Sequence, residues 1–203
     1  MKKQVFQVIC ADSPWSFSDG LKMSSVKRGA KSNYNTMSTQ QLQALRVKDI
    51  ADPNGCLLAL WCPSSLLKGG LEIMEAWGFQ LKTTYVWVKS KKNLPQDLKL
   101  DQSLSFGMGR TFRASHEVAL IGINNTKIYQ ALQNKSQRSV SFAPNLGHSV
   151  KPETLQDSLD LMFPKTNKIE LFARRERNGW TCLGNECSAS KGEDIIVSLE
   201  KLL

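Results

Sequence analysis

Short apolar segments alternate along this chain with segments in which apolar residues recur at helical spacing. The apolar segments are rich in Val, Ile, Leu or aromatic residues, as expected for buried β-strands. They span Val5–Cys10, Cys56–Trp61, Thr83–Val88, Glu117–Ile123 and Lys168–Ala173. This alternation favours an α/β sandwich in which a mostly parallel central sheet carries helices on both faces.

Four segments are predicted to be helical. The first begins at the capping sequence Ser38-Thr39-Gln40-Gln41 and places Leu42, Leu45 and Ile50 on one face. The others run from Leu66 to a stop at Gly78, from Pro152 to Met162, and from Ile195 to Leu203. Because 203 residues suffice for one well-buried domain but are short for two, we expect a single domain over residues 1–203.

Two long segments, 16–36 and 89–115, fall outside this pattern. Both are polar and basic, and segments of this length in a compact domain are usually functional or disordered. The chain carries 27 Lys and Arg against 18 Asp and Glu, a net charge of +9 that favours nucleic acid over an anionic membrane as partner. We therefore expect these segments to bind nucleic acid through Lys27, Arg28, Lys89, Arg110 and Arg113.

The cysteines and histidines form no metal-binding motif. Five cysteines are an odd number without a Cys-x-x-Cys pair, and the two histidines are His116 and His148. The sequence has no apolar run of about eighteen residues, and Met1-Lys2-Lys3-Gln4 is a poor start for a signal peptide. The composition predicts a reduced, cytoplasmic protein without a metal ion or a membrane span.

The segment Ala11-Asp12-Ser13-Pro14-Trp15 directly follows the first predicted strand. Ligands bind at the carboxyl ends of strands in open α/β sheets. Asp12 can accept a hydrogen bond from an amine, Trp15 offers a stacking face, and Pro14 fixes the neighbouring backbone carbonyls. This combination suits a flat base that carries an amino group. The alternative is an Asp-Ser-Pro turn at a strand end, with Trp15 half buried.

Eight segments carry motifs that occur in the same order in one enzyme family. The signature Asp-Pro-Pro-Trp of that family is matched by Asp12-Ser13-Pro14-Trp15, and its Val-Trp-Val-Lys is unchanged at Val86-Trp87-Val88-Lys89. The remaining matches are Tyr34-Asn35-Thr36-Met37-Ser38, Leu60-Trp61 with Trp77-Gly78-Phe79, His116-Glu117 before Leu120-Ile121-Gly122, Ser149-Val150-Lys151-Pro152-Glu153, Glu170-Leu171-Phe172-Ala173-Arg174, and Gly179-Trp180 with Gly184-Asn185-Glu186. Over nearly its whole length the chain resembles the MTA-70-like (also written MT-A70) adenine methyltransferases.

The resemblance implies a Rossmann-like methyltransferase fold in permuted order, with the catalytic motif preceding the cofactor-binding strand. It implies S-adenosylmethionine as the cofactor. The catalytic half of the site would be Asp12, Ser13, Pro14 and Trp15, with Asp12 also bordering the cofactor. The residues implied for the cofactor half are Lys151 at the methionine carboxylate, Arg174 and Asn185 at the ribose and adenine, Glu186 nearby, and Glu170 on the cofactor strand.

These residues also have structural interpretations that the sequence leaves open. Lys151-Pro152-Glu153 is a suitable helix start, and Arg174-Arg175-Glu176-Arg177 is a typical solvated charge run. Glu170 alternates with apolar neighbours, as an outward-facing strand residue does.

Two departures from the family pattern affect the site. Ser13 replaces the first proline of the signature, at the position whose backbone carbonyl holds the base amine in the family, so that the carbonyl is retained. The family often has an acidic pair well upstream that meets the cofactor adenine, whereas eleven residues precede Asp12 here. We therefore expect the backbone near Ile9 and Cys10 to complete the adenine pocket.

The resemblance also implies the chemistry. The adenine amine is a weak nucleophile because its lone pair is delocalised into the ring. If Asp12 and the Ser13 carbonyl accept hydrogen bonds from the two N–H groups of the amine, the lone pair becomes localised on the nitrogen. The nitrogen would then attack the sulfonium methyl in line, and the rate would come from orientation and electrostatics. Trp15 would stack on the base, and Tyr34, at the end of the first basic segment, would lie near the substrate.

The expected function is methyl transfer to the 6-amino group of adenine in DNA by an enzyme of bacterial or phage type, acting as a monomer or homodimer. Two alternative hypotheses stay open. One is the same reaction on RNA, and the other is a nucleic-acid-binding subunit that supports a catalytic partner.

Overall fold

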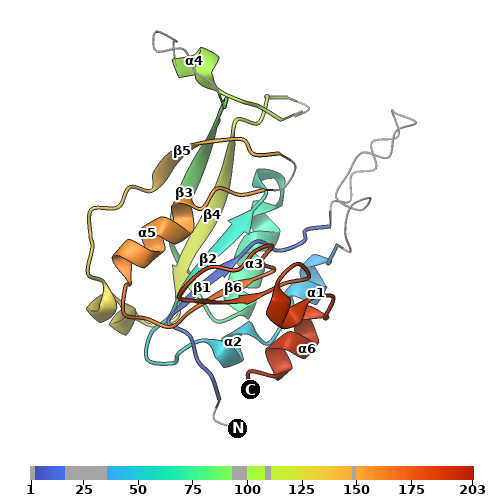
Figure 1. Ribbon diagram of the computed structural model, residues 1–203, viewed down its shortest axis with the longest axis vertical. Helices are drawn as coiled ribbons and strands as arrows, with labels where there is room; N and C mark the ends of the chain where they lie inside the picture. Colours follow the sequence, from blue (N-terminus) through green and yellow to red (C-terminus); the bar gives the residue numbers. More distant parts are fainter. Residues whose placement is uncertain (1–2, 17–35, 93–99, 108–110, 148–149) are drawn as a thin grey trace.

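The described part of the chain is built around one seven-stranded sheet (Figure 1). The computed structural model describes residues 3–16, 36–92, 100–107, 111–147 and 150–203. The strands are β1 (Val8–Ala11), β2 (Leu57–Cys62), β3 (Gln80–Ser90), β4 (His116–Ile123), β5 (Val140–Pro144), β6 (Lys168–Leu171) and β7 (Trp180–Leu183), in the order β5-β3-β4-β2-β1-β6-β7. Strand β4 pairs antiparallel with β2 and β3, and all other pairings are parallel. The predicted α/β fold with a mostly parallel sheet is confirmed.

The central strands β1 and β2 are buried on both faces. Side chains of β1 alternate between two cores, with Val8 and Cys10 in one and Ile9 and Ala11 in the other. Every residue of β2 is buried. Continuous apolar strands of this kind are typical of parallel sheets that helices cover on both sides.

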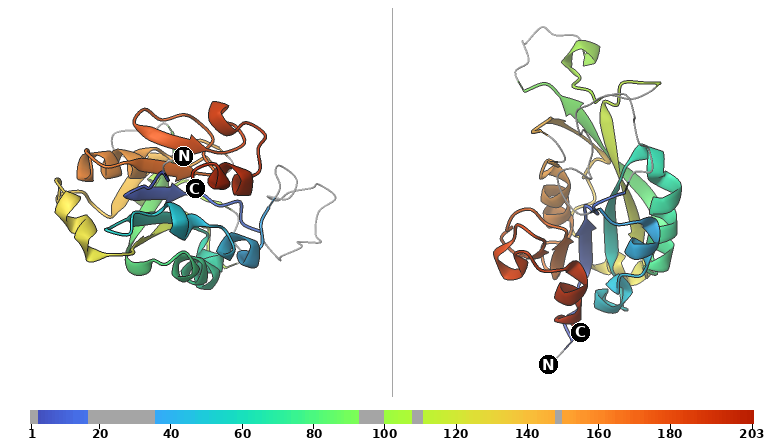
Figure 2. Two further views of the ribbon diagram at one scale, coloured as in Figure 1. Left: turned by 90° about the horizontal axis from the view of Figure 1, so that it is seen from below. Right: turned by 90° about the vertical axis from the view of Figure 1, so that its right-hand side faces the viewer.

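Helices cover both faces of the sheet (Figure 2). On one face lie α1 (Thr39–Gln43), α2 (Val47–Ile50), the 3-10 turn η2 (Ser64–Leu66), α3 (Leu67–Ala76) and α6 (Ile195–Glu200). On the other face lie η3 (Thr126–Ala131) and α5 (Thr154–Met162), whose buried Leu155 and Leu159 pack in the core that contains Val8. The prediction that helices cover both faces of the sheet is confirmed.

Local sequence explains where the helices begin and end. The Ser38 hydroxyl accepts a hydrogen bond from the Gln41 amide while the Gln41 side chain accepts one from the Ser38 amide, which forms the predicted capping box of α1. Beyond α1 the predicted long helix is interrupted, and α2 is a separate short helix. Helix α3 ends just before Gly78, whose φ of +83° is a backbone conformation that favours glycine.

Strands β3 and β4 project past the other strands and carry α4 (Leu100–Ser103) at their far end (Figure 1). The returning chain is tied to β3 by hydrogen bonds from Ser105 N to Lys89 O (2.8 Å) and from Lys91 N to Ser103 O (2.9 Å). At the opposite end of the molecule the first and last described segments of the chain meet, where Gln4 N donates to Leu202 O at 3.0 Å.

Candidate active site

A cleft of about 1180 Å³ lies at one edge of the sheet. It is lined by residues that follow β1, β2, β6 and β7 and by the first residues of β4, which starts at this edge because it runs antiparallel. The lining includes Asp12 to Trp15, Pro63 to Ser65, Lys89, His116, Glu117, Lys151, Phe172 to Arg174, and Gly184 to Glu186. The carboxyl edge of the parallel strands, where the sequence predicts the site, therefore holds the cleft.

The catalytic motif forms a tight, well-anchored turn after β1. Trp15 N donates to Ser13 O at 2.9 Å, and Met37 N donates to Pro14 O at 2.8 Å. The Trp15 indole donates to Trp61 O at 3.1 Å and is only 5% exposed. Trp15 thus borders the cleft but belongs largely to the core, which leaves little of its ring for stacking on a base.

Asp12 ends a row of four alternating charges that crosses the cleft. Lys151 Nζ lies 3.0 Å from both carboxylate oxygens of Asp12 and 3.2 Å from Glu117 Oε2. The other oxygen of Glu117 lies 2.7 Å from Lys89 Nζ. The two ammonium groups also stand over aromatic rings, Lys151 at 5.8 Å from the Trp61 centroid and Lys89 at 5.2 Å from the Trp87 centroid.

Burial and pairing shift the pKa values of these groups. Burial raises the pKa of Asp12, and the Lys151 ammonium opposes that rise. Burial would raise the pKa of Glu117 as well, but Lys151 and Lys89 outweigh it and lower this pKa below its ordinary value. Burial would lower the pKa of Lys151, but Asp12 and Glu117 outweigh it and raise this pKa. Mutual pairing therefore keeps charges in a partly buried place where an isolated charge would be costly.

The opposite wall is made by two loops that pack tightly together. The loop after β6 contains Arg174, and the loop after β7 contains Asn185 and Glu186. A Cβ on Gly184 would stand 2.0 Å from Ala173 O, so that this close approach requires glycine. Ala173 N donates to Leu183 O at 2.9 Å across the same contact.

Arg177 fastens the loop after β6 to helix α5. Its guanidinium contacts the carboxylates of Glu153, Asp157 (2.6 Å) and Asp160 (2.8 Å). The indole of Trp180 also donates to Asp160, at 2.9 Å. The predicted charge run is thus partly a structural clamp.

The structure does not bring all predicted residues to the cleft. Ile9 and Cys10 are fully buried in β1, whose backbone pairs with β2 on one side and β6 on the other. Glu170 lies outside the lining, where it accepts a hydrogen bond from Gln156 at 3.1 Å, and burial raises its pKa to about 7. Arg113 is exposed beside the cleft. The predicted substrate-binding residues Lys27, Arg28, Tyr34 and Arg110 lie outside the residues that the structure describes.

Several cleft residues were not singled out from the sequence. Glu117 belonged to a family segment, but nothing local indicated that it would pair with Lys151. Ser64 and Ser65 follow the end of β2 after one intervening residue, so a search for polar residues at strand ends could have found them. Glu193 and Ser198 come from the α6 region and gave no signal.

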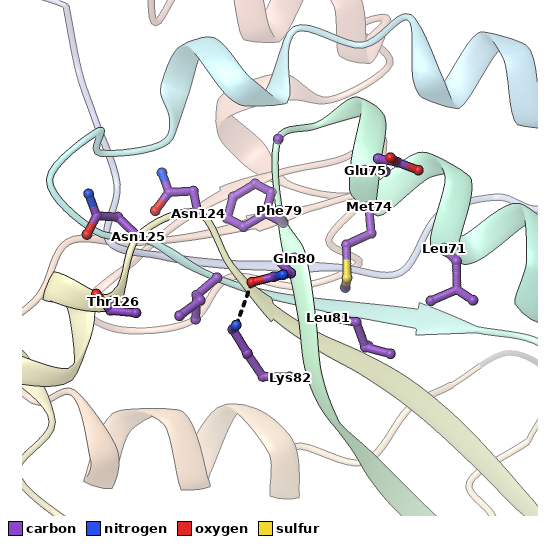
Figure 3. A pocket seen from close by; sticks show the side chains of 12 residues that line it. Leu71, Met74, Glu75, Phe79, Gln80, Leu81, Lys82, Asn124, Asn125 and Thr126 are labelled. Carbon is purple, nitrogen blue, oxygen red and sulfur yellow. Dashed lines mark hydrogen bonds between the residues drawn. The ribbon is translucent and has the colours of Figure 1, made fainter.

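A second pocket of about 500 Å³ lies where β3 begins and β4 ends, away from the catalytic motif (Figure 3). It is lined by Leu71, Met74, Gln80 and Lys82 among others, and Lys82 donates to Gln80 at 2.6 Å. None of the predicted site residues lines it. Within the described ranges, no group of three or more His, Cys, Asp or Glu is placed to hold a metal ion, and no helix is long and apolar enough to cross a membrane.

A polar cleft at the carboxyl edge of a mostly parallel sheet is the framework of a ligand-binding α/β enzyme. The sequence defines the class further, since the profile of the family described as MT-A70 matches residues 6–186. The chain belongs to this family of adenine methyltransferases.

Three relatives illustrate the similarity. The chain is 28% identical to the Type II methyltransferase M.MunI of Mycoplasma sp, over 95% of this chain and 82% of M.MunI. It is 25% identical to the human N(6)-adenine-specific methyltransferase METTL4, over 98% of this chain and 41% of METTL4. It is 24% identical to the human N(6)-adenosine-methyltransferase catalytic subunit METTL3, over 89% of this chain and 28% of METTL3. The chain thus spans most of M.MunI but less than half of either human protein.

Proposed function

We propose that this protein transfers a methyl group from S-adenosylmethionine to the exocyclic 6-amino group of adenine in DNA. The observation that carries the proposal is the Asp12 carboxylate, which borders the cleft and is held by Lys151 at 3.0 Å. The similarity to M.MunI along most of both chains supports DNA, and the names of METTL4 and METTL3 support the adenine amine as acceptor.

The cleft residues fit S-adenosylmethionine. At about 1180 Å³ the cleft is large enough for a nucleoside cofactor and a base side by side. The backbone contact between Gly184 and Ala173 joins two loops into one wall, where Arg174, Asn185 and Glu186 offer polar groups for the ribose and adenine. When bound there, S-adenosylmethionine supplies the electrophilic methyl group. In this assignment the catalytic motif after β1 precedes the cofactor loop after β6, which is the permuted order.

The ion pairs favour a revised role for Lys151. Its ammonium is already matched by two carboxylates, Asp12 and Glu117, and it stands between them. We therefore assign Lys151 to orienting Asp12 toward the base, with a contact to the methionine carboxylate as a secondary role. Glu117 and Lys89 in turn fix Lys151.

The Asp12 carboxylate and the Ser13 carbonyl act on the amine by accepting hydrogen bonds from its two N–H groups. Ser13 O already accepts the Trp15 amide, and a carbonyl oxygen retains a second lone pair for the amine. Accepting both hydrogens localises the nitrogen lone pair toward the methyl group. Catalysis then comes from orientation and from preorganised charge. The N–CH3 bond would form as the S–CH3 bond breaks, with S-adenosylhomocysteine as the leaving group, and the methylated amine would then give its surplus proton to water.

The test is methyl incorporation from labelled S-adenosylmethionine into three adenine-unmethylated substrates: duplex DNA, the same DNA after heat denaturation, and RNA. The proposal predicts label in DNA adenines. Glu75→Ala, at the far pocket, is the control and should behave as the natural protein does. Label in RNA but not in DNA would show that RNA is the substrate and contradict the DNA assignment. No label in any of the three substrates would contradict the enzymatic function.

A further inference from the structure

Two phenylalanines stand exposed at the rim of the cleft. Phe112 is 86% exposed and Phe106 is 56% exposed, whereas Thr111 and Ala114 line the cleft itself. The large rings of Trp61, Trp77 and Trp87 are by contrast fully buried. Exposed aromatic rings grouped at the mouth of a binding site commonly mark a surface that a ligand covers.

Backbone hydrogen bonds hold this rim in place. Gly107 N donates to Ala114 O at 2.8 Å, and Ala114 N donates to Gly107 O at 3.2 Å. Phe106, next to Gly107, and Phe112, two residues before Ala114, therefore lie beside this bridge. The Arg113 guanidinium stands 5.9 Å from the Phe106 ring centroid, which leaves Phe112 as the more exposed of the two rings.

The surroundings of the two rings are basic. Between residues 89 and 115, Lys91, Lys92 and Arg113 are exposed, whereas Lys89 is paired with Glu117. Cations together with exposed aromatic rings suit a nucleic acid, because the cations can pair with phosphates while the rings stack on bases. The charge of this rim thus favours nucleic acid as its occupant.

We propose that Phe112 enters the base stack of duplex DNA when the target adenine turns out into the cleft. This inference rests on the proposed methyl transfer to adenine. Enzymes that act on a base inside a duplex must rotate it out of the helix, since its reacting atom is otherwise inaccessible. Apolar side chains that enter between base steps stabilise the opened duplex. Phe112 is placed for this insertion, because it sits between cleft-lining residues while its own ring faces solvent.

The experiment compares methyl incorporation into adenine-unmethylated plasmid DNA as duplex and after heat denaturation. Phe112→Ala should lower the rate on the duplex about tenfold, the order expected when one stacked base is lost, and should change the rate on denatured DNA by less than about twofold. Phe112→Trp should preserve the duplex rate. The matched control is Phe142→Ala, which removes a 57% exposed ring from β5 and should alter neither rate.

Three results would overturn the inference while leaving adenine methylation intact. They are an unchanged duplex rate in Phe112→Ala, an equal loss on duplex and denatured DNA, and a natural protein that methylates only denatured DNA. A natural protein that labels neither form of DNA would instead contradict the proposed function and the inference together.

Discussion

Lys151 Nζ lies 3.0 Å from each carboxylate oxygen of Asp12, a residue 139 positions away in the chain. The same ammonium lies 3.2 Å from Glu117, at the start of β4. The orientation of the proposed catalytic acid therefore depends on three parts of the fold: the turn after β1, the start of β4 and the segment before α5.

Lys151→Met should reduce methyl transfer by about 100-fold, because Asp12 loses the group that orients it. The change also leaves the partly buried carboxylate of Asp12 without its cation, so the free energy of unfolding should fall by about 3 kcal/mol. Methyl-transfer rates and urea unfolding measure the two effects. Lys127→Met, which removes an exposed lysine, is the control. A normal transfer rate in Lys151→Met would show that Lys151 does not contribute to methyl transfer.

Stability in acid should report the pairing of Glu117. Its pKa lies below the ordinary value of 4.5, so its contribution to the free energy of unfolding is complete above pH 4.5. That contribution is lost as the pH falls from 4.5 through the lower pKa of the folded state. Urea unfolding between about pH 3 and pH 7 should show a steeper acid loss for the natural protein than for Glu117→Gln. Parallel curves would mean that the ion pairs of Glu117 do not stabilise the fold.

Gly184→Ala should loosen the wall of the cleft that the loops after β6 and β7 form. The new Cβ would stand 2.0 Å from Ala173 O, which is backbone and can move only if the loops after β6 and β7 separate. We expect a loss of about 2 kcal/mol in the free energy of unfolding and a smaller thermal shift with S-adenosylmethionine. Gly69→Ala is the matched control, because its Cβ would meet only the Thr39 side chain at 3.2 Å. Equal behaviour of the two variants would argue against the tight wall.

Arg177→Ala should loosen the loop after β6. The change removes one guanidinium that contacts Glu153, Asp157 and Asp160, and it leaves three carboxylates close together. Since the arginine side chain is only 15% exposed, we expect a loss of about 2 kcal/mol in the free energy of unfolding. Urea unfolding at low and high salt is the measurement, with Arg46→Ala, from an exposed pair, as the control. A loss no larger than that of the control would show that the clamp is dispensable.

Much of the fold could be predicted from residue patterns, because each of the five predicted strands corresponds to an observed one. The two missed strands are short and weakly patterned. Strand β5 (Val140–Pro144) lies at the sheet edge, where Val140 and Phe142 stay exposed, and it ends in proline. Strand β7 (Trp180–Leu183) has only four residues and follows a charge run. Pairing with β3 and β6 forms these strands, and a local pattern does not contain that information.

The site was predictable from residue patterns where a motif follows a predicted strand, as for Asp12, whereas Asn185 follows the missed strand β7 and was implied by the family resemblance. The pairing of Lys151 with both Asp12 and Glu117 was not predictable, because it joins groups that meet only after the sheet has formed. The adenine pocket expected near Ile9 and Cys10 rests on no local pattern, and the strand pairings of β1 show why these buried residues lie outside the cleft.

The central claim is that Asp12 activates the adenine amine, and Asp12→Ala tests it most directly. The assay is transfer of labelled methyl from S-adenosylmethionine to the nucleic acid that the natural protein modifies, together with the thermal shift caused by the cofactor. We predict no detectable transfer by Asp12→Ala and a cofactor shift close to that of the natural protein, because Arg174, Asn185 and Glu186 are untouched. Methyl transfer by Asp12→Ala at a rate near that of the natural protein would contradict the account.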